Sequence, residues 1–235
     1  MQAGTFSPIV ELRRYTLHPG QRDVLITLFD REFVETQEAV GIEVIGQFRD
    51  LDAPDHFVWL RGFPDLRSRT ESLRAFYGGP VWQAHRSAAN ATMIDSDDVL
   101  LLRPAHPDSG FRLGRDRPAP GGEAGGIIVA TTWHLRPEAE AGFPAIFETM
   151  LVPMLGDAGV PILASFVSEH GENGFPALPV RKDARVFVWF SRLPDRAAHE
   201  RRAAVPGFAE ALRPHLARPP EVALLSPTAR SRLCG

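Results

Sequence analysis

Hydrophobic and polar positions alternate in a way that divides the chain into two similar series of elements. Short runs rich in β-branched and aromatic residues, bounded by Gly, Pro or Asp, predict strands. Apolar residues spaced three and four apart predict helices. In the first half, strands are predicted at 9–17, 43–49, 56–63 and 99–103, and helices at 20–40, 64–77 and 81–91. This is the β-α-β-β-α-β order of the ferredoxin-like motif.

The second half repeats this order. Strands are predicted at 127–135, 160–169, 185–193 and 222–225, and helical regions at 136–155 and 194–216. Phe57-Val58-Trp59 recurs as Phe187-Val188-Trp189, and the segment 41–48 matches 159–166. The offset is 118 early in the repeat and 130 later, and the 12 additional residues fall in the loop 171–184. We therefore predict an internal duplication.

The strand 56–63 indicates how the two halves pack together. Phe57, Trp59, Arg61 and Phe63 share one face, whereas the alternate positions Val58, Leu60 and Gly62 share the other. Both faces are largely apolar, so both should be buried. The predicted fold is α+β, with tandem ferredoxin-like repeats packed sheet to sheet as an intrachain α/β barrel. The predicted boundaries are 1–104 for the first half, 105–126 for a Pro/Gly-rich linker, 127–228 for the second half and 229–235 for a tail.

Composition excludes several classes of protein. The net charge of −3 argues against a nucleic-acid partner, because such proteins usually carry a basic face. The single cysteine, Cys234, cannot form an intramolecular disulfide or a cysteine zinc cluster. The sequence has no signal-peptide pattern and no run of about 18 apolar residues that would span a membrane. A cytoplasmic location is expected.

Polar residues on the first strand are the main candidates for chemistry. Glu11, Arg13 and Tyr15 share one face of the strand, which is unusual for a core. They could line a cavity in which Tyr15 donates a hydrogen bond to a substrate oxygen and Arg13 stabilises negative charge. A buried ion pair that supports the sheet is the alternative. Arg61 has Ser191 as its counterpart, so a polar site is expected in the N-terminal half alone.

A second set of candidates lies on the predicted helix 81–91. Trp82, His85 and Arg86 are spaced three and four residues apart and share a face. His85 could serve as a general base or a haem ligand. The alternative is that Trp82 packs in the core while the other two form hydrogen bonds at its edge. Aromatic residues complete the predicted ligand-binding set, and these are Phe48, Trp59 and Trp133.

Known catalytic and metal motifs are missing from the sequence. There is no P-loop, no dinucleotide-binding glycine motif followed by a helix, no H-E-x-x-H and no G-x-S-x-G. No His, Asp or Glu set has recognisable metal-ligand spacing, so no metal site is predicted.

Two segments resemble the NIPSNAP family. These are Val10-Glu11-Leu12-Arg13-Arg14-Tyr15-Thr16-Leu17-His18-Pro19-Gly20, and the run 79–93 (GPVWQAHRSAANATM) followed by the strand 99–104. The resemblance covers residues 8–104 well and 126–228 more loosely. It implies the dimeric α/β-barrel superfamily, which includes cofactor-free monooxygenases, isomerases and haem-degrading enzymes.

Three functions follow from the residues and the resemblance. The first is a cofactor-independent enzyme of the oxygenase, isomerase or cyclase type, which acts on a small hydrophobic metabolite. Its catalytic residues would be Tyr15, Arg13, His85 and Arg61. The second is a non-catalytic binding or scaffold protein. The third is a haem protein with His85 or His134 as the axial ligand. A homodimer is left open, with the loop 171–184 as a lid or a dimer contact.

Overall fold

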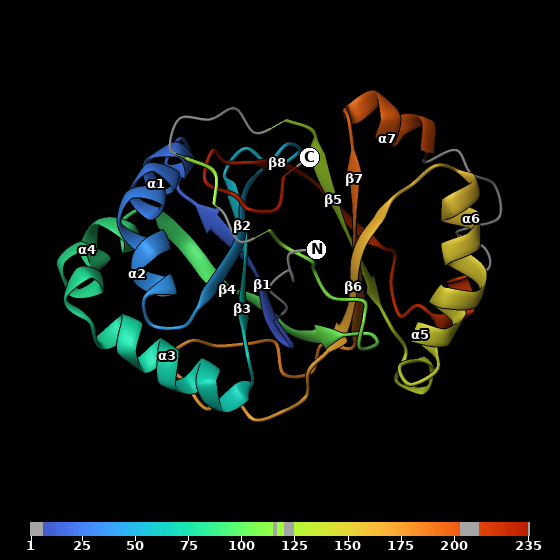
Figure 1. Ribbon diagram of the computed structural model, residues 1–235, viewed down its shortest axis with the longest axis horizontal. Coiled ribbons are helices and arrows are strands. Elements are labelled where there is room, and N and C mark those ends of the chain that lie inside the picture. The colour runs from blue at the N-terminus through green and yellow to red at the C-terminus, as the bar shows by residue number, and fades with distance from the viewer. Residues whose placement is uncertain (1–6, 115–116, 120–124, 203–211, 235) are drawn as a thin grey trace.

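The computed structural model describes residues 7–114, 117–119, 125–202 and 212–234. The first half contains four strands and a layer of helices (Figure 1). Its elements are β1 (Ile9–Leu17), α1 (Arg22–Leu28), the π-helical turn η1 (Phe29–Phe33), α2 (Val34–Glu38), β2 (Glu43–Asp50), β3 (His56–Phe63), α3 (Leu66–Gly78), α4 (Pro80–Asn90) and β4 (Met93–Pro104). The strand and helix assignments from sequence hold, but β4 begins six residues earlier than predicted, at Met93.

The second half repeats the series with a more interrupted first helix. Its elements are β5 (Ile127–His134), the 3-10 turn η2 (Pro137–Ala139), α5 (Phe143–Ile146), the π-helical turn η3 (Phe147–Leu151), α6 (Val152–Asp157), β6 (Ile162–Ser168), β7 (Val186–Leu193), α7 (Arg196–Arg202), the 3-10 turn η4 (Arg213–His215) and β8 (Glu221–Pro227). The middle of the helical region predicted at 194–216 lies outside the described residues.

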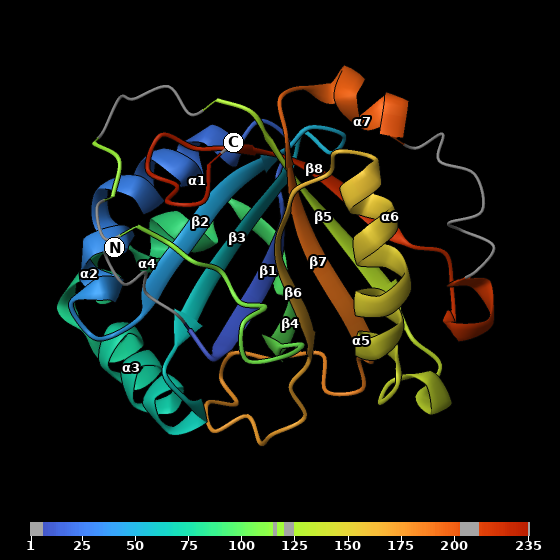
Figure 2. The ribbon, with the colours of Figure 1, turned by 45° about the vertical axis from the view of Figure 1, so that its right-hand side comes forward.

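All eight strands form one closed antiparallel barrel in the order β1-β3-β2-β8-β5-β7-β6-β4 (Figure 2). Within each half, the first strand pairs with the third and fourth, and the second pairs with the third. Two short seams join the halves. Residues 48–50 of β2 pair with 225–227 of β8, and 102–104 of β4 pair with 166–168 of β6. The fold is therefore α+β, and both sheet edges of each half are paired.

Alternation along the strands separates two kinds of core. Val58 and Leu60 point into the barrel and pack against residues of the other half, such as Phe166 and Phe190. Their neighbours on β3 point outwards and pack under α1–α4. The second half has its own outer core beneath α5 and α6. Figure 1 shows the helices of the two halves on opposite sides of the barrel. The prediction that both faces of β3 are buried is confirmed.

Local irregularities recur at the same positions in the two halves. The π-helical turns begin at Phe29 and, 118 residues later, at Phe147. Gly41 and Gly159, also 118 apart, both adopt a positive φ before β2 and β6. A register shift falls after Val44 in β2 and after Ile162 in β6. The π-helical turns lie outside the segments whose sequences match, so they are a further likeness between the two halves.

The predicted linker and tail contribute to the core instead of lying outside it. Phe111 and Leu113 are buried inside the barrel, where Phe111 contacts the rings of Phe166 and Phe190. Leu233 belongs to the same core, and its backbone N–H donates to the Ile45 carbonyl on β2. The segments predicted as a linker and a tail thus carry core residues, because composition does not show which loop residues a barrel encloses.

Among the residues that the structure describes, no helix has the length and apolar character needed to cross a membrane.

Candidate active site

A cluster of four charged side chains lies between the sheet and the helices of the first half. It consists of Glu11 on β1, Arg13 on β1, Arg61 on β3 and Arg69 on α3, and we call it the charge cluster. All four side chains are excluded from solvent. The Glu11 carboxylate accepts from Arg13 Nη1 at 2.7 Å, from Arg61 Nε at 2.8 Å and from Arg69 Nε at 2.6 Å. Three buried guanidinium groups thus share one carboxylate.

The arginines fix the ionisation of their neighbours. Burial alone would raise the pKa of the Glu11 carboxyl, but Arg61, Arg13 and Arg69 together hold that pKa well below its ordinary range. Glu11 therefore stays ionised and is unsuited to act as a general base. Burial raises the pKa of the Tyr15 phenol, so Tyr15 stays protonated at neutral pH. Of the two alternatives for Glu11 and Arg13, the buried ion pair is the arrangement observed.

A small cavity of about 30 Å³ adjoins the charge cluster. Tyr15 and Trp59 form its floor on the sheet, and aromatic side chains of the helices form its walls. Two further lining residues, Gln37 and Tyr77, each accept a hydrogen bond from Arg61 Nη1, at 3.3 and 3.4 Å. The Tyr15 hydroxyl accepts from Arg13 Nε at 3.1 Å. The remaining wall residues are Leu25, Phe29, Phe33, Phe76, Trp82, Ala89 and Met93.

Three groups beside this cavity are available as hydrogen-bond donors. Tyr15 and Tyr77 each use the phenol oxygen to accept from an arginine, which leaves their O–H protons free to donate elsewhere. Within the described part of the chain, the buried indole N–H of Trp59 has no hydrogen-bond partner. Phenol and indole donors backed by positive charge are the kind of group that stabilises a developing oxyanion.

The structure brings some of the predicted site residues together and separates others. Trp82 packs against Phe33 and lines the cavity, whereas His85 lies at the outer rim with its Nε2 3.5 Å from Glu32. Arg86 is exposed. Phe48 points into the barrel on the opposite side of the sheet, and Trp133 belongs to the core of the second half. Phe48, Arg86 and Trp133 therefore do not contact the cavity near Tyr15.

Sequence reasoning missed Arg69, Tyr77 and Asn173. Arg69 had a visible signal, because it shares the apolar stripe of α3 with Leu73 and Phe76. A charged residue in such a stripe is seldom buried unless it is paired. Asn173 has no comparable signal, because it lies in a loop of the other half.

The second half lacks the charges. Glu11 pairs with Arg61 across β1 and β3, and the corresponding pair across β5 and β7 is Val129 and Ser191. Thr131 occupies the position of Arg13. The expected chemical asymmetry between Arg61 and Ser191 thus extends to the three strand positions of the charge cluster.

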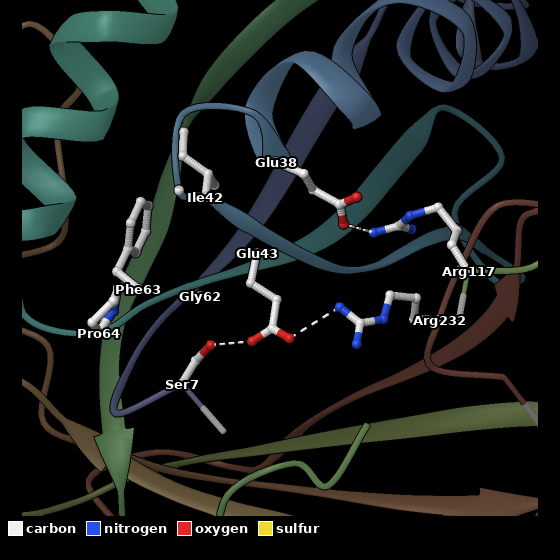
Figure 3. A pocket seen from close by; sticks show the side chains of 10 residues that line it. Ser7, Glu38, Ile42, Glu43, Gly62, Phe63, Pro64, Arg117 and Arg232 are labelled. Carbon is white, nitrogen blue, oxygen red and sulfur yellow. Dashed lines mark hydrogen bonds and ion pairs between the residues drawn. The ribbon is translucent and has the colours of Figure 1, made fainter. Parts of the chain in front are cut away.

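A larger pocket of about 510 Å³ opens beside the start of β2 (Figure 3). Its charged side chains are paired with one another: Arg117 with Glu38, and Arg232 with Glu43, which also accepts from Ser7. Arg117 comes from the segment between the halves and Arg232 from the C-terminal segment. These pairs therefore tie one segment to the end of α2 and the other to the start of β2, which is a structural role.

Replacing Arg117 with Ala is expected to lower the free energy of unfolding by about 2 kcal/mol. The Arg117 guanidinium donates to the carbonyl oxygens of Arg230 and Val44 and to Glu38, so its loss leaves buried acceptors without a donor. Urea denaturation measures the change. Arg112→Ala is the matched control, because Arg112 is exposed and pairs only at the surface with Asp108. Equal effects of the two substitutions would contradict the assigned role.

A third, open pocket of about 470 Å³ lies at the end of β5. It is lined by His134 together with Arg181, Lys182, Arg185 and Arg218. Burial and the nearby Arg218 lower the pKa of His134, whose Nε2 lies 3.0 Å from a Glu221 oxygen. The three arginines pair with Asp98, Glu140 and Glu221, in that order. Because its three arginines are already paired, this pocket is a weaker candidate site.

Asp30, on the π-helical turn beside the cavity wall, is predicted to make folding pH-dependent. Burial raises the pKa of its carboxyl to about 6. A folded-state pKa above the unfolded value means that the ionised form is fully penalised above pH 6, and that the penalty disappears only as the pH falls below the unfolded pKa of about 3.9. Asp30→Asn should therefore raise the free energy of unfolding at pH 8 by about 1–2 kcal/mol and leave it nearly unchanged at about pH 3. Parallel stability curves for the two proteins between these pH values would contradict the shift.

Comparison with known proteins identifies the first half. Residues 10–107 match the NIPSNAP family model. This segment is a NIPSNAP domain. It spans β1 from its second residue and the whole of β2, β3 and β4. All four residues of the charge cluster lie within it. The resemblance seen in the sequence is therefore confirmed for this half.

Solved structures share the fold over the whole chain. A "putative monooxygenase" from Fusobacterium nucleatum aligns at a TM-score of 0.63 and 10% identity, covering 100% of this chain and 97% of its own. A "putative monooxygenase" from Lactobacillus acidophilus aligns at 0.59 and 11% identity, covering 94% of each chain. An "anthrone oxidase-like protein" aligns at 0.58 and 15%, covering 99% and 98%. No curated protein matches the chain. At these identities the structures establish the fold alone.

Proposed function

We propose that the NIPSNAP domain binds a small hydrophobic metabolite between its sheet and helices and transforms it without a bound cofactor. The observation that carries this proposal is the cavity bounded by Tyr15, Trp59 and Tyr77, next to a buried excess of positive charge. Oxygenation, isomerisation and cyclisation that begin with removal of a proton beside a carbonyl or from a phenol develop negative charge on a substrate oxygen. Fixed donors in a water-excluded site stabilise such charge strongly.

The roles within this proposal follow from the contacts. Tyr15 donates to the substrate oxygen, while Arg13, which donates to the Tyr15 oxygen, makes its proton a stronger donor. Arg61 acts on Tyr77 and Gln37 in the same way. His85 is the candidate base, because its ring lies 6.4 Å from the ring of Phe33 in the cavity wall. Phe33 has to move for His85 to reach a substrate.

The cavity must enlarge to admit a ligand, because small-molecule pockets measure about 300–1,000 Å³. Its present volume of about 30 Å³ holds only an atom or two. The small volume is also what favours the alternative function, a binding or scaffold protein in which the aromatic side chains only pack. A homodimer and a cytoplasmic location stay predictions.

The residues present do not fit a haem. His85 lies outside a cavity far smaller than a haem, and the Nε2 of His134 is engaged by Glu221 and Arg218. Among the described residues, no group of three His, Cys, Asp or Glu side chains could hold a metal ion. That the reaction needs no cofactor stays a prediction.

We also infer that the two halves arose by duplication of one ferredoxin-like unit, which would extend the NIPSNAP-like fold to about residues 127–228. The matching strand pairings support this inference, as do the π-helical turns, glycines and register shifts that recur 118 residues apart.

Native mass spectrometry of protein purified from its own host tests binding. We expect a retained small molecule in the wild type and its loss in Ala89→Val, because Ala89 lines the cavity and the larger side chain fills it. Ala88→Val, an exposed position on the same helix, is the matched control. An absent molecule in the wild type, or one that Ala89→Val retains equally, would contradict the proposal.

The retained molecule then tests catalysis. Incubated with the wild type in air, it should be converted to a product of different mass or retention time. Tyr15→Phe removes the proposed donor, so it should slow this conversion about 100-fold while the mass spectrum still shows the bound molecule. A molecule that the wild type binds and leaves unchanged would favour the non-catalytic alternative.

A further inference from the structure

A loop from the second half covers the charge cluster of the first. This loop, residues 171–184, is called the covering loop, and it passes beneath α3 in both ribbon views (Figures 1 and 2). Phe175, Leu178 and Val180 pack against the outer core of the first half. The Arg181 backbone N–H donates to the Val99 carbonyl on β4. The covering loop contains the 12 residues that the second half has in addition to the first. It therefore lies against the candidate site, where a lid would lie.

The covering loop places two functional groups on the site. Asn173 is buried, and its amide oxygen accepts from Arg69 Nη1 at 2.9 Å. Two residues later, the phenyl ring of Phe175 stacks on the ring of Tyr77 with centroids 5.8 Å apart and planes inclined by 22°. Tyr77 in turn accepts from Arg61 and lines the cavity. The covering loop therefore places an oxygen acceptor on Arg69 of the charge cluster and an aromatic ring on Tyr77 of the cavity wall.

The charge cluster carries more positive than negative charge. Three arginines face the single carboxylate of Glu11, and the amide of Asn173 adds no charge. In the part of the chain that the structure describes, the buried Arg69 Nη2 has no hydrogen-bond partner. Arg69 thus presents Nη1 to a neutral oxygen and has Nη2 unused. The two N–H groups of such an edge match the two oxygens of a carboxylate.

We propose that this site binds an aromatic carboxylate, and that Asn173 and Phe175 occupy the places of its carboxylate and its ring until the ligand displaces them. The ligand carboxylate bonds to Nη1 and Nη2 of Arg69 and supplies negative charge that the cluster lacks. Its ring takes the place of Phe175 on Tyr77 and extends towards the cavity as the covering loop lifts. This inference rests on the proposed function and names the class of molecule that the site accepts.

Fluorescence titration tests the charge requirement, because Trp59 and Trp82 line the cavity. The probes are 2-naphthoate and its uncharged analogue naphthalene-2-carboxamide, which have nearly the same shape. We expect saturable binding of 2-naphthoate with a Kd at least about tenfold below that of the carboxamide, since hydrogen bonds between charged partners are about twice as strong as neutral ones. Isothermal titration calorimetry on the same pair checks the stoichiometry of one per chain.

Variants of the covering loop give effects of opposite sign. Asn173→Ala combined with Phe175→Ala removes the competing groups, so 2-naphthoate should bind about tenfold more tightly. Asn173→Asp places a carboxylate on Arg69, so 2-naphthoate should bind at least about tenfold more weakly, with the fold retained. Arg69→Gln should abolish the preference for the acid over the carboxamide. Arg67→Gln, on the exposed face of the same helix, should leave both affinities unchanged.

The outcomes separate this inference from the proposed function. Carboxamide binding as tight as naphthoate binding would overturn the anion requirement and leave small-molecule binding intact. Equal affinities of Asn173→Asp and of the double variant Asn173→Ala/Phe175→Ala for 2-naphthoate would overturn the displacement of the covering loop. If neither probe binds the wild type or the double variant, the inference fails, and the molecule retained in native mass spectrometry decides the proposed function alone.

Discussion

Replacing Glu11 with Gln is expected to lower the free energy of unfolding by about 3–5 kcal/mol at pH 7. The substitution keeps the size of the side chain but removes the only carboxylate that contacts Arg13, Arg61 and Arg69 in the described structure. Three buried guanidinium charges then lack a counter-ion, and the cost of removing a charge from water is large when it is unpaired. Urea denaturation followed by circular dichroism measures the change.

Acid should abolish the difference between the two proteins. Because the arginines hold the folded-state pKa of Glu11 below its unfolded value, the stabilisation is present above about pH 4.3 and is lost as the pH falls further. The wild type should therefore lose stability below pH 4 more steeply than Glu11→Gln does. Glu71→Gln is the control, because Glu71 is exposed and pairs only with Arg67, so its effect should stay within about 0.5 kcal/mol. A loss below 1 kcal/mol for Glu11→Gln would show that the cluster does not depend on this carboxylate.

The charges on β1 and β3 of the charge cluster are found in the first half of the barrel and not at the equivalent positions of the second. In the second half, Val129, Thr131 and Ser191 stand where the first half has Glu11, Arg13 and Arg61, and Val129 is part of an apolar core with Leu193 and Leu224. The second half thus completes its part of the barrel without charges at these three positions. The barrel itself does not require them, which supports the proposal that the charges of the first half serve ligand binding.

Sequence patterns predicted the strands well because local signals agree with the fold. The run 56–63 alternates between two apolar faces and is bounded by Asp55 and Pro64, and β3 has those bounds. A Pro-Asp pair follows the third strand of each half, as Pro64-Asp65 and Pro194-Asp195, and it also acts locally. Asp65 caps α3 by accepting from the Ser68 N–H, and Asp195 accepts from the Ala198 N–H in the same way. Such signals depend only on neighbours in sequence.

Contacts between distant segments were not predictable in this way. Glu11 is a candidate from sequence because polar residues are unusual on a core strand, but its bond from Arg69 on α3 joins distant segments. Arg69 in turn donates to Asn173 of the covering loop. Asn173 is separated from Arg69 by 104 positions and follows no periodic pattern. Phe48 and Trp133 were assigned to the candidate site on residue type alone, and the closed barrel places them in two other cores.

Phe111 illustrates the same limit and provides the second large effect. Phe111→Ala is expected to lower the free energy of unfolding by about 3–5 kcal/mol, because it removes a buried ring that contacts Phe166 and Phe190 inside the barrel and leaves a void there. Guanidinium denaturation measures the loss. Phe111→Leu retains most of the apolar volume and should cost less than half as much. A linker that only connects the halves would tolerate both substitutions. A loss of unfolding free energy within about 0.5 kcal/mol for Phe111→Ala would therefore show that this segment is only a linker. A large loss would mean that the barrel interior is completed by the segment that joins its halves, and that a chain cut after residue 104 lacks part of its own core.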